Sequence, residues 1–518
     1  MKFKDLIFPL SLAFLLTWGI KYWYFGDSKT SGDQGEVVSG QSFVAPKTRQ
    51  EIRPLNKEID FIDEKRLHPR VLTEFETNLA KYTFSSDGAS LERLEYTGAS
   101  NGKLRGLGTV FPVSDAEKEN KCLLLAFDEK TPYYYSFVDK QENDLEVVLR
   151  YRYDSPKSDV SVDKTFTVYK NTYKIDLKIE VSPKKVLEKG VEPRLFFGAP
   201  VMPDLGKDDL VSAVGVNERG SVTKTARASL DENVGRLKPK LFGTDSKYFV
   251  NAMISDPDQF VQRAYYKLLG DAKLFSILEG PTVDKKQAWS VSFYFGPKKQ
   301  EALAIVDARL EKTLGYAGWL DFISKYLLLI LKFFDKYLKN YGLAIILLTL
   351  LLRLLMLPFT LKMESGMKKR KELQKKLEYI QRKYKHDKAT LAQERAELMR
   401  KHGMTGLGGC LPLLLQIPIF IALANVLRSS IELYREPFLW ITDLSAKDPY
   451  YIFPALMSLG MLINAFTVDP KQRFMFIAMG LVIGPLCSGM SAGLGLYIVS
   501  SVGIGLLQSF VVKKFKSA

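Results

Sequence analysis

A single charged residue inside a long apolar stretch is the strongest candidate for chemistry in this chain. Arg353 lies near the middle of the stretch 341–361, whose roughly twenty residues are otherwise apolar and long enough to cross a bilayer core. An arginine at that depth costs about 2.5–3.5 kcal/mol on insertion scales, so it needs water or a partner. Because no Asp or Glu lies within the other apolar segments, we expect a water-filled cavity that attracts acidic segments of another chain.

Familiar catalytic and metal-binding motifs do not account for the chain. It holds no Walker GxxxxGK[ST] loop and no HExxH motif. With 3 histidines, and 3 cysteines that lie far apart, it offers few metal ligands and no disulfide framework. We therefore expect no cofactor, no metal and no covalent catalysis. Single polar residues in apolar segments usually form interhelical hydrogen bonds. Here they are Thr349, Gln416, Asn425, Asn464, Ser488 and Gln508.

The totals indicate a membrane protein with a large water-soluble part. A chain of 518 residues is expected to form two or three domains. The net charge of +16 suggests nucleic acid or an anionic membrane surface as partner, and the basic residues flank apolar segments, which favours the membrane. The mean hydropathy of -0.06 is low for a chain with several spans, so a polar domain must dilute them.

Residues 1–55 predict an anchor and a tether. Residues 1–25 begin with Lys2 and Lys4, continue with an apolar run and close on aromatic residues that suit a membrane interface. A cleaved signal peptide would need a small-residue cleavage site, so we favour an uncleaved signal anchor with its N-terminus in the cytoplasm. Residues 26–55 are polar and rich in Gly and Ser, and they predict a flexible periplasmic linker.

Residues 56–317 predict a large antiparallel β-sandwich with more strands than the usual seven. Apolar and polar residues alternate in short runs, separated by turn signals such as Ser86-Asp87-Gly88 and Asn101-Gly102. A cleft could bind sugar or peptide, but a sugar epimerase would need paired histidines with a carboxylate, and this region holds only His68. We favour a rigid domain without active chemistry. The clearest predicted strands are 145–153, 164–169, 173–181, 259–268 and 289–296.

Residues 318–340 predict an amphipathic helix that lies in the membrane interface. At about 100° per residue, the charged residues fall on one arc, opposite a face of Leu, Ile, Phe and Trp319. The alternative is a core helix of the soluble domain, and the position directly before the stretch 341–361 favours the interface. The residues of the arc are Asp321, Lys325, Lys332, Lys336 and Lys339.

Residues 362–405 predict a basic helical hairpin with its turn at 386–388. Lys and Arg far outnumber Asp and Glu, which marks the cytoplasmic side by the positive-inside rule. The hairpin can serve as a topology determinant, as a docking arm for a ribosome or targeting receptor, or as both. The candidate docking residues, including two from the short turn 468–473, are Lys368, Lys369, Arg370, Lys375, Lys376, Arg382, Lys383, Lys471 and Arg473.

The apolar stretches predict six membrane spans. After the N-terminal anchor, they are 341–361, 406–428, 450–467, 474–490 and 493–512. Residues 429–449 predict a periplasmic loop, 468–473 a cytoplasmic turn and 513–518 a short basic tail. This topology places both termini in the cytoplasm and the β-rich domain in the periplasm.

Several stretches resemble the YidC/Oxa/Alb family of membrane protein insertases. LGGCLPLLLQIPIFIAL (407–423) and LWITDLSAKDPYYIFPALM (439–457) look like its signature segments. LLRLLMLPFT (351–360) and LGLYIVS (494–500) are similar to its other helix motifs. In the soluble region, KYFV (247–250) and FYFGPK (293–298) resemble the large periplasmic domain of the Gram-negative YidC branch.

The resemblance implies a polytopic α-helical membrane protein with a large periplasmic β domain. It implies an N-terminal anchor, a super-β-sandwich like a galactose mutarotase, and five core helices around a hydrophilic groove open to cytoplasm and lipid. The fifth span departs from the family, because 479–496 is glycine-rich where the family is often rich in Phe. The implied groove residues are Arg353, Thr349, Gln416 and Tyr497, to which we add Asn464; Ile417 and Pro418 match the slide that guest helices contact.

We therefore expect an insertase and chaperone of the bacterial inner membrane, without enzymatic activity. Its expected partners are nascent inner-membrane proteins, the Sec translocon, the lipid bilayer and a ribosome or targeting receptor, with no specific nucleic-acid sequence. Two alternatives stay open. A transporter or channel would show internal repeats, and none is seen between the halves of the bundle. A membrane-tethered glycan-binding domain would need no intramembrane arginine.

Overall fold

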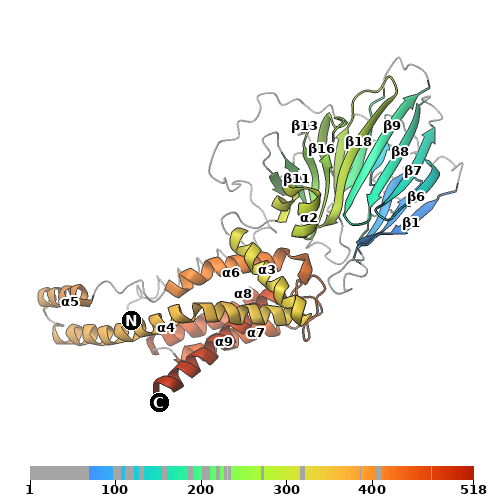
Figure 1. Cartoon of the computed structure of the whole chain (residues 1–518). Helices are drawn as coiled ribbons and strands as arrows, with labels where there is room; N and C mark the ends of the chain where they lie inside the picture. The colour runs from blue at the N-terminus through green and yellow to red at the C-terminus, as the bar shows by residue number, and fades with distance from the viewer. Residues whose placement is uncertain are drawn as a thin grey trace. The chain divides into compact units, whose positions relative to one another are not determined.

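The structure is a computed structural model that arranges the described residues in two compact units (Figure 1). A β-rich unit lies within residues 69–314, and a helical unit lies within residues 321–428 and 433–517. The predicted anchor, the predicted linker and the turn Asn101-Gly102 lie outside the described residues. The described residues are 69–96, 107–110, 122–127, 134–154, 160–184, 191–200, 211–216, 222–226, 230, 235–269, 273–314, 321–385, 387–402, 411–467 and 470–517.

The β-rich unit contains three antiparallel sheets. The 9-stranded sheet has the order β12-β11-β14-β15-β18-β9-β8-β7-β6, the 5-stranded sheet β13-β16-β17-β10-β5, and the 4-stranded sheet β1-β2-β3-β4. The prediction of a large antiparallel β domain with more than seven strands is therefore confirmed. The strands are β1 (Leu72–Glu76), β2 (Ala80–Ser85), β3 (Ser90–Tyr96), β4 (Leu107–Val110), β5 (Leu124–Ala126), β6 (Ser136–Glu142), β7 (Glu146–Asp154), β8 (Val160–Tyr169), β9 (Lys174–Pro183), β10 (Arg194–Gly198), β11 (Ser212–Val216), β12 (Val222–Ala226), β13 (Arg236–Leu237), β14 (Leu241–Asp245), β15 (Phe249–Ser255), β16 (Arg263–Leu269), β17 (Lys273–Glu279) and β18 (Gln287–Pro297).

Period-two alternation places one face of the long strands in the core. In β7, Val147, Leu149, Tyr151 and Tyr153 are buried between exposed or half-buried neighbours. The five predicted strands coincide with β7, β8, β9, most of β16, and β18. The two smaller sheets pack on the large one through aromatic pairs. Ring centroids are 4.9 Å apart between Phe84 and Phe166, and 5.5 Å apart between Phe197 and Phe293.

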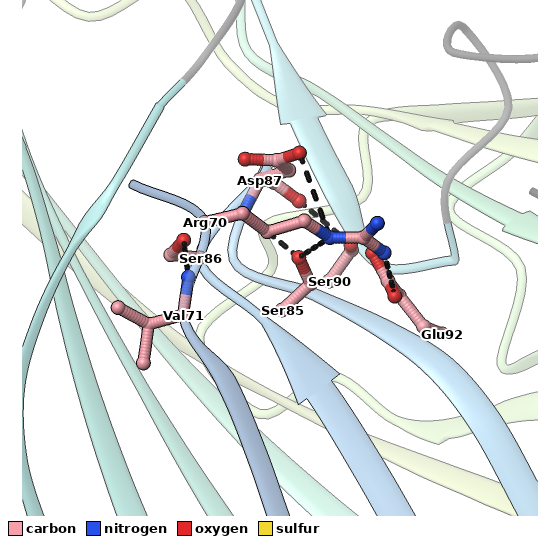
Figure 2. A network of polar contacts seen from close by, with 7 residues as sticks. All are labelled: Arg70, Val71, Ser85, Ser86, Asp87, Ser90 and Glu92. Carbon is pink, nitrogen blue, oxygen red and sulfur yellow. Dashed lines mark hydrogen bonds and ion pairs between the residues drawn. The ribbon is translucent and has the colours of Figure 1, made fainter. Parts of the chain in front are cut away.

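A polar network fixes the start of β1 to the turn between β2 and β3 (Figure 2). Arg70 binds the carboxylate of Glu92 through Nη2, and its Nε lies 3.8 Å from Asp87 and 3.3 Å from the hydroxyl of Ser85. Both carboxylates are buried. A carboxylate taken out of water needs a positive partner, so Arg70 neutralises two buried charges at this turn.

We expect Arg70→Met to destabilise the β-rich unit by about 1–3 kcal/mol, because it leaves two buried carboxylates without their cation. The effect lies at the low end for buried pairs because Arg70 is 33% exposed. Urea unfolding of the full chain in detergent, followed by hydrogen exchange of peptides from β2 and β3, measures it. Arg152→Met, which removes an exposed pair with Asp154, is the control and should change stability by less than about 1 kcal/mol. Equal effects of the two variants would contradict the prediction.

A buried lysine crosses the core beneath the same turn. Lys164 in β8 is fully buried, and its Nζ donates hydrogen bonds to the carbonyl oxygens of Gly88, Ala89 and Leu123 at 3.0, 2.6 and 2.5 Å. The rings of Tyr135 and Phe166 lie 5.3 and 5.1 Å from the ammonium. Three donors meet three acceptors, so the charge is solvated entirely by the protein.

The helical unit contains most of the helices. They are α3 (Asp321–Leu338), α4 (Tyr341–Lys383), α5 (Lys388–His402), α6 (Leu411–Ser429), α7 (Ile452–Thr467), α8 (Pro470–Cys487) and α9 (Ala492–Ser517). The other helices among the described residues are α2 (Gln300–Val306) and the 3-10 helices η5 (Ala308–Leu314) and η7 (Ile431–Leu433). Helix α4 lies beside α3 and α9, and α7 lies beside α8 and α9 (Figure 1).

The predicted spans coincide with α4, α6, α7, α8 and α9. Among the described residues, one helical segment, Tyr341–Pro358, is both long enough and apolar enough to cross a membrane. Shorter apolar segments are Ile417–Arg428, Ile452–Ile463, Ile477–Cys487 and Ala492–Gln508. Helix α4 does not end where the apolar stretch ends, because it continues through the basic segment to Lys383. The first arm of the predicted hairpin is therefore continuous with the apolar part of α4, and α5 covers the residues of the predicted second arm.

Helix α3 belongs to the helical unit. Leu327, Leu328 and Leu331 are buried in the core that α3 shares with the other helices. A separate stripe of large residues is exposed, comprising Phe322, Tyr326, Leu329, Phe333 and Tyr337. The apolar side of α3 is thus divided between contact with the bundle and an exposed, largely aromatic stripe, and its position in a membrane interface remains a prediction.

One end of the helical unit is closed by the loop after η7. Gly493 N–H donates to the carbonyl of Leu444 at 2.8 Å, and Ala492 N–H donates to that of Ala446 at 2.7 Å. Asp448 accepts the indole N–H of Trp440 at 3.1 Å and the N–H of Phe453 at 2.7 Å. A Cβ at Gly342 would lie 2.0 Å from the ring of Phe438, so the ring fills the space beside the start of α4. These contacts connect the starts of α4, α7 and α9.

Candidate functional site

Arg353 projects from α4 toward α9 and is only partly buried. Its Nε and Nη2 both donate to the hydroxyl oxygen of Ser501, at 3.1 and 2.8 Å. Within the part of the chain that the structure describes, these are its hydrogen bonds, and it makes no ion pair. The partner that the structure gives to this arginine is thus a neutral hydroxyl group.

One face of α9 receives the guanidinium. Tyr497, Ser501 and Gly505 are spaced by four residues, so they lie on one side of the helix. A Cβ at Gly505 would lie 3.3 Å from Nη1, 3.4 Å from Nη2 and 3.5 Å from Cζ of Arg353. The absence of a side chain at Gly505 thus leaves room for the guanidinium. Sequence reasoning named Tyr497 but missed Ser501 and Gly505, although the four-residue spacing pointed to them.

A small cavity lies beside the guanidinium. Its volume is about 10 Å³, close to the roughly 10–15 Å³ that one water molecule needs. The hydroxyl of Thr349 faces this region and donates to the carbonyl of Ile345 at 2.7 Å. The structure therefore brings together three of the predicted groove residues around space for about one water. The residues that line the cavity are Thr349, Leu352, Arg353, Met356, Ile419, Tyr497 and Ser501.

Helix α6 contributes the opposite wall. Ile419 lines the cavity, and the ring of Phe420 lies 6.5 Å from that of Tyr497. The predicted slide residues Ile417 and Pro418 directly precede Ile419 and are half-buried. The side chains of Gln416 and Asn464 lie outside the described residues, so both remain predictions.

The glycines of the fifth span serve packing with α7. A Cβ at Gly484 would lie 2.3 Å from the hydroxyl of Ser458 and 3.2 Å from the carbonyl of Pro454. A Cβ at Gly480 would lie 3.2 Å from Cβ of Met461. Small residues four apart allow such close helix contact in membranes. The departure from the family's Phe-rich pattern therefore has a structural role, while Leu481 and Val482 of α8 are exposed.

We expect Gly484→Val to destabilise the helical unit by about 1–3 kcal/mol, because the added methyl groups force α7 and α8 apart. The matched control is Gly503→Val in α9, where a Cβ would meet nothing within 4 Å. The comparison is the melting temperature of the two purified variants in detergent. If the two variants have the same melting temperature, the close contact at Gly484 contributes nothing to stability.

The basic docking candidates are only partly described. Lys376, Arg382 and Lys383 lie on the last turns of α4, where Lys383 Nζ lies 5.1 Å from the ring of Tyr384. The guanidinium of Arg473 lies 5.5 Å from the ring of Phe466. The side chains of Lys368, Lys369, Arg370, Lys375 and Lys471 lie outside the described residues, and their role remains a prediction.

The β-rich unit holds a separate open pocket of about 390 Å³. Lys238, Lys240, Asp256 and Arg309 are among its lining residues, and none of the described residues that line it is a histidine. The lining therefore differs from the paired histidines and carboxylate that a sugar epimerase needs. Across the described residues, no group of three or more His, Cys, Asp or Glu could hold a metal ion.

The chain is similar in sequence to known proteins along both of its units. Residues 73–330 match the YidC periplasmic domain, and residues 333–518 match the 60Kd inner membrane protein family. The chain is 32% identical to the membrane protein insertase YidC of Syntrophus aciditrophicus over 68% of its length and 67% of that protein. It is 31% identical to the YidC of Geobacter metallireducens, over 71% of each chain. A crystal structure of an active YidC insertase is 22% identical, covering 86% of this chain and 93% of that chain, with a TM-score of 0.38. From the sequence matches along both of its units, this chain belongs to the YidC family of membrane protein insertases.

Proposed function

We propose that this protein inserts nascent proteins into the inner membrane, and that it holds a polar segment of each guest beside Arg353 during insertion. The observation that carries this proposal is the guanidinium between α4, α6 and α9, which has a hydroxyl partner and adjoining space for about one water. A cation in a poorly solvated site attracts a carboxylate more strongly than a cation in bulk water does.

The groove opens toward the cytoplasm in this proposal. On α4, Tyr341, Ala344, Ile345 and Leu348 are almost fully buried near the closed end, while Arg353 is only partly buried. The packing therefore loosens away from the loop that covers the starts of α4, α7 and α9. We place that loop and the β-rich unit in the periplasm, and both termini and the basic arms in the cytoplasm.

Insertion is driven by lipid burial of the guest's apolar helix. Each buried CH₂ contributes about 0.8 kcal/mol, so a spanning helix supplies far more free energy than the transfer of a short polar segment costs. The protein lowers the barrier by shortening the dry distance that the polar segment must cross. The guest helix leaves along Ile417 and Pro418, and the membrane potential assists acidic segments outward.

The basic residues at the end of α4 supply a surface for a ribosome or targeting receptor, and cooperation with the Sec translocon serves larger guests. A transporter is the less suitable proposal, because the sequence shows no internal repeat between the halves of the bundle.

The test uses liposomes that contain the purified full chain and a small single-span guest with a short acidic external tail. We expect protease protection of the tail inside these vesicles and not inside protein-free liposomes of the same lipid. Equal protection in both would refute the insertase proposal. Dye retention during the same assay checks that the vesicles stay sealed, as a transporter-type pore would release small solutes.

A further inference from the structure

One edge of the Arg353 guanidinium is occupied by a single neutral acceptor. Nε–H and Nη2–H point in parallel from the same edge of the fork, and both donate to the hydroxyl oxygen of Ser501. This edge is the one that binds the two oxygens of a carboxylate in bidentate pairs. Ser501 is 8% exposed, so water does not compete freely for this position.

A carboxylate is the stronger ligand for this edge. Hydrogen bonds between ionised partners are roughly twice as strong as those between neutral groups, and a carboxylate accepts each donor on its own oxygen. Ser501 offers one oxygen to two donors. Gly505 leaves the other side of the guanidinium uncrowded, and the adjoining cavity has room for about one water. Both features leave space beside the guanidinium.

We propose that Ser501 is a placeholder that occupies the carboxylate-binding edge of Arg353 until an acidic residue of a guest replaces it. The inference rests on the proposed insertase function and adds guest specificity to it. Ser501 acts through Arg353 and is a positioning residue. It keeps the arginine hydrogen-bonded when the site is empty, and its neutrality allows the exchange. A permanent acid at this position would occupy the edge and remove the preference for acidic guests.

The test compares Ser501→Asp with Ser501→Asn, which are alike in size and differ in charge. Each is reconstituted in liposomes with two single-span guests that differ only by Asp or Asn in the external tail. The Asp variant should insert the acidic guest at least tenfold more slowly than the Asn variant, and the neutral guest equally fast. Ser501→Ala should keep insertion of the acidic guest, because the guest itself supplies the acceptor.

Four results would overturn the inference. Equal rates for Ser501→Asp and Ser501→Asn with the acidic guest would show that the edge is not used. A loss in Ser501→Ala would show that the hydroxyl is required rather than exchanged. Equal slowing of both guests by Ser501→Asp would indicate a structural effect. Wild-type vesicles that insert neither guest would refute the proposed function itself, and the inference with it.

A second experiment introduces the charge after folding. It is used if the Ser501→Asp variant has a lower melting temperature than the Ser501→Asn variant. In a chain whose native cysteines are replaced by alanine, Ser501→Cys is reacted with iodoacetate or with iodoacetamide. The two adducts have the same size, and one carries a negative charge. We expect the charged adduct alone to lose the preference for the acidic guest, and equal behaviour of the two adducts would contradict the placeholder role.

Discussion

Replacing Arg353 by alanine is expected to slow insertion of an acidic-tailed guest by roughly tenfold to a hundredfold. A hydrogen bond to a charged group contributes about 1.5–3 kcal/mol, and each 1.36 kcal/mol of barrier is about a factor of ten in rate. The variant removes the cation beside the cavity and leaves neutral hydroxyl-bearing residues, Thr349, Tyr497 and Ser501, among the described residues that line it. The measurement is the initial rate of tail protection in liposomes that contain equal amounts of wild type or variant.

Two further substitutions sharpen this prediction. Arg353→Lys keeps the charge but loses the fork that binds both oxygens of a carboxylate, so it should be intermediate. Leu355→Ala is the control, because Leu355 lies on the same helix and is 63% exposed. This variant should insert guests at the wild-type rate. If Arg353→Ala inserts the acidic guest at the wild-type rate, Arg353 is one polar group among several and the electrostatic account is wrong.

Replacing Lys164 by methionine is expected to destabilise the β-rich unit by at least about 3 kcal/mol. Methionine has a similar shape but leaves the carbonyls of Gly88, Ala89 and Leu123 without a donor, at about 1–3 kcal/mol for each. The gain from no longer burying an ammonium offsets part of this cost. Burial lowers the pKa of Lys164 well below its usual 10.5, because desolvation opposes the charged form.

The backbone conformation of the residues that bind Lys164 adds to the expected loss of stability. Gly88, Ala89 and Leu123 have φ values of 72°, 41° and 65°, and such values are strained for alanine and leucine. The ammonium connects both segments to β8 through its three hydrogen bonds, and the variant removes that connection. Hydrogen exchange of peptides from β5 and β8 during urea unfolding of the full chain measures the effect.

Lys178→Met is the matched control for this prediction. Lys178 lies on the neighbouring strand β9, is 54% exposed and pairs with Glu180, so its replacement should cost less than about 1 kcal/mol. A Lys164→Met variant as stable as Lys178→Met would mean that the three carbonyls find other donors.

The alternating strands show what local pattern determines. In β7, β8 and β9, burial follows every second residue, because successive side chains leave a strand on opposite faces. The same rule places Lys164 on the buried face between Val162 and Phe166, so its inward direction is readable from the sequence. The three carbonyl partners of Lys164 cannot be predicted in this way, because they lie 41 to 76 residues away in the chain.

The helix boundaries show a limit of composition. The apolar stretch 341–361 ends at its first lysine, but the helix continues to Lys383. Hydropathy reports the solvent around a segment, whereas backbone hydrogen bonding decides where the helix ends, and Lys, Glu, Gln and Leu are all good helix formers. The first arm of the predicted hairpin can therefore be part of the same long helix as the apolar stretch.

By itself, the sequence determined the β-rich and helical parts, the likeness to the insertase family and the isolated cation Arg353. These depend on residue type and near-neighbour spacing, which act locally along the chain. The tertiary structure alone decided that Ser501 and Gly505 surround that cation and that the glycines of α8 face α7. Those assignments depend on which faces of distant helices meet, 148 residues apart for Arg353 and Ser501. Helix contact of this kind is a property of packing, and spacing within one helix only narrows the candidates.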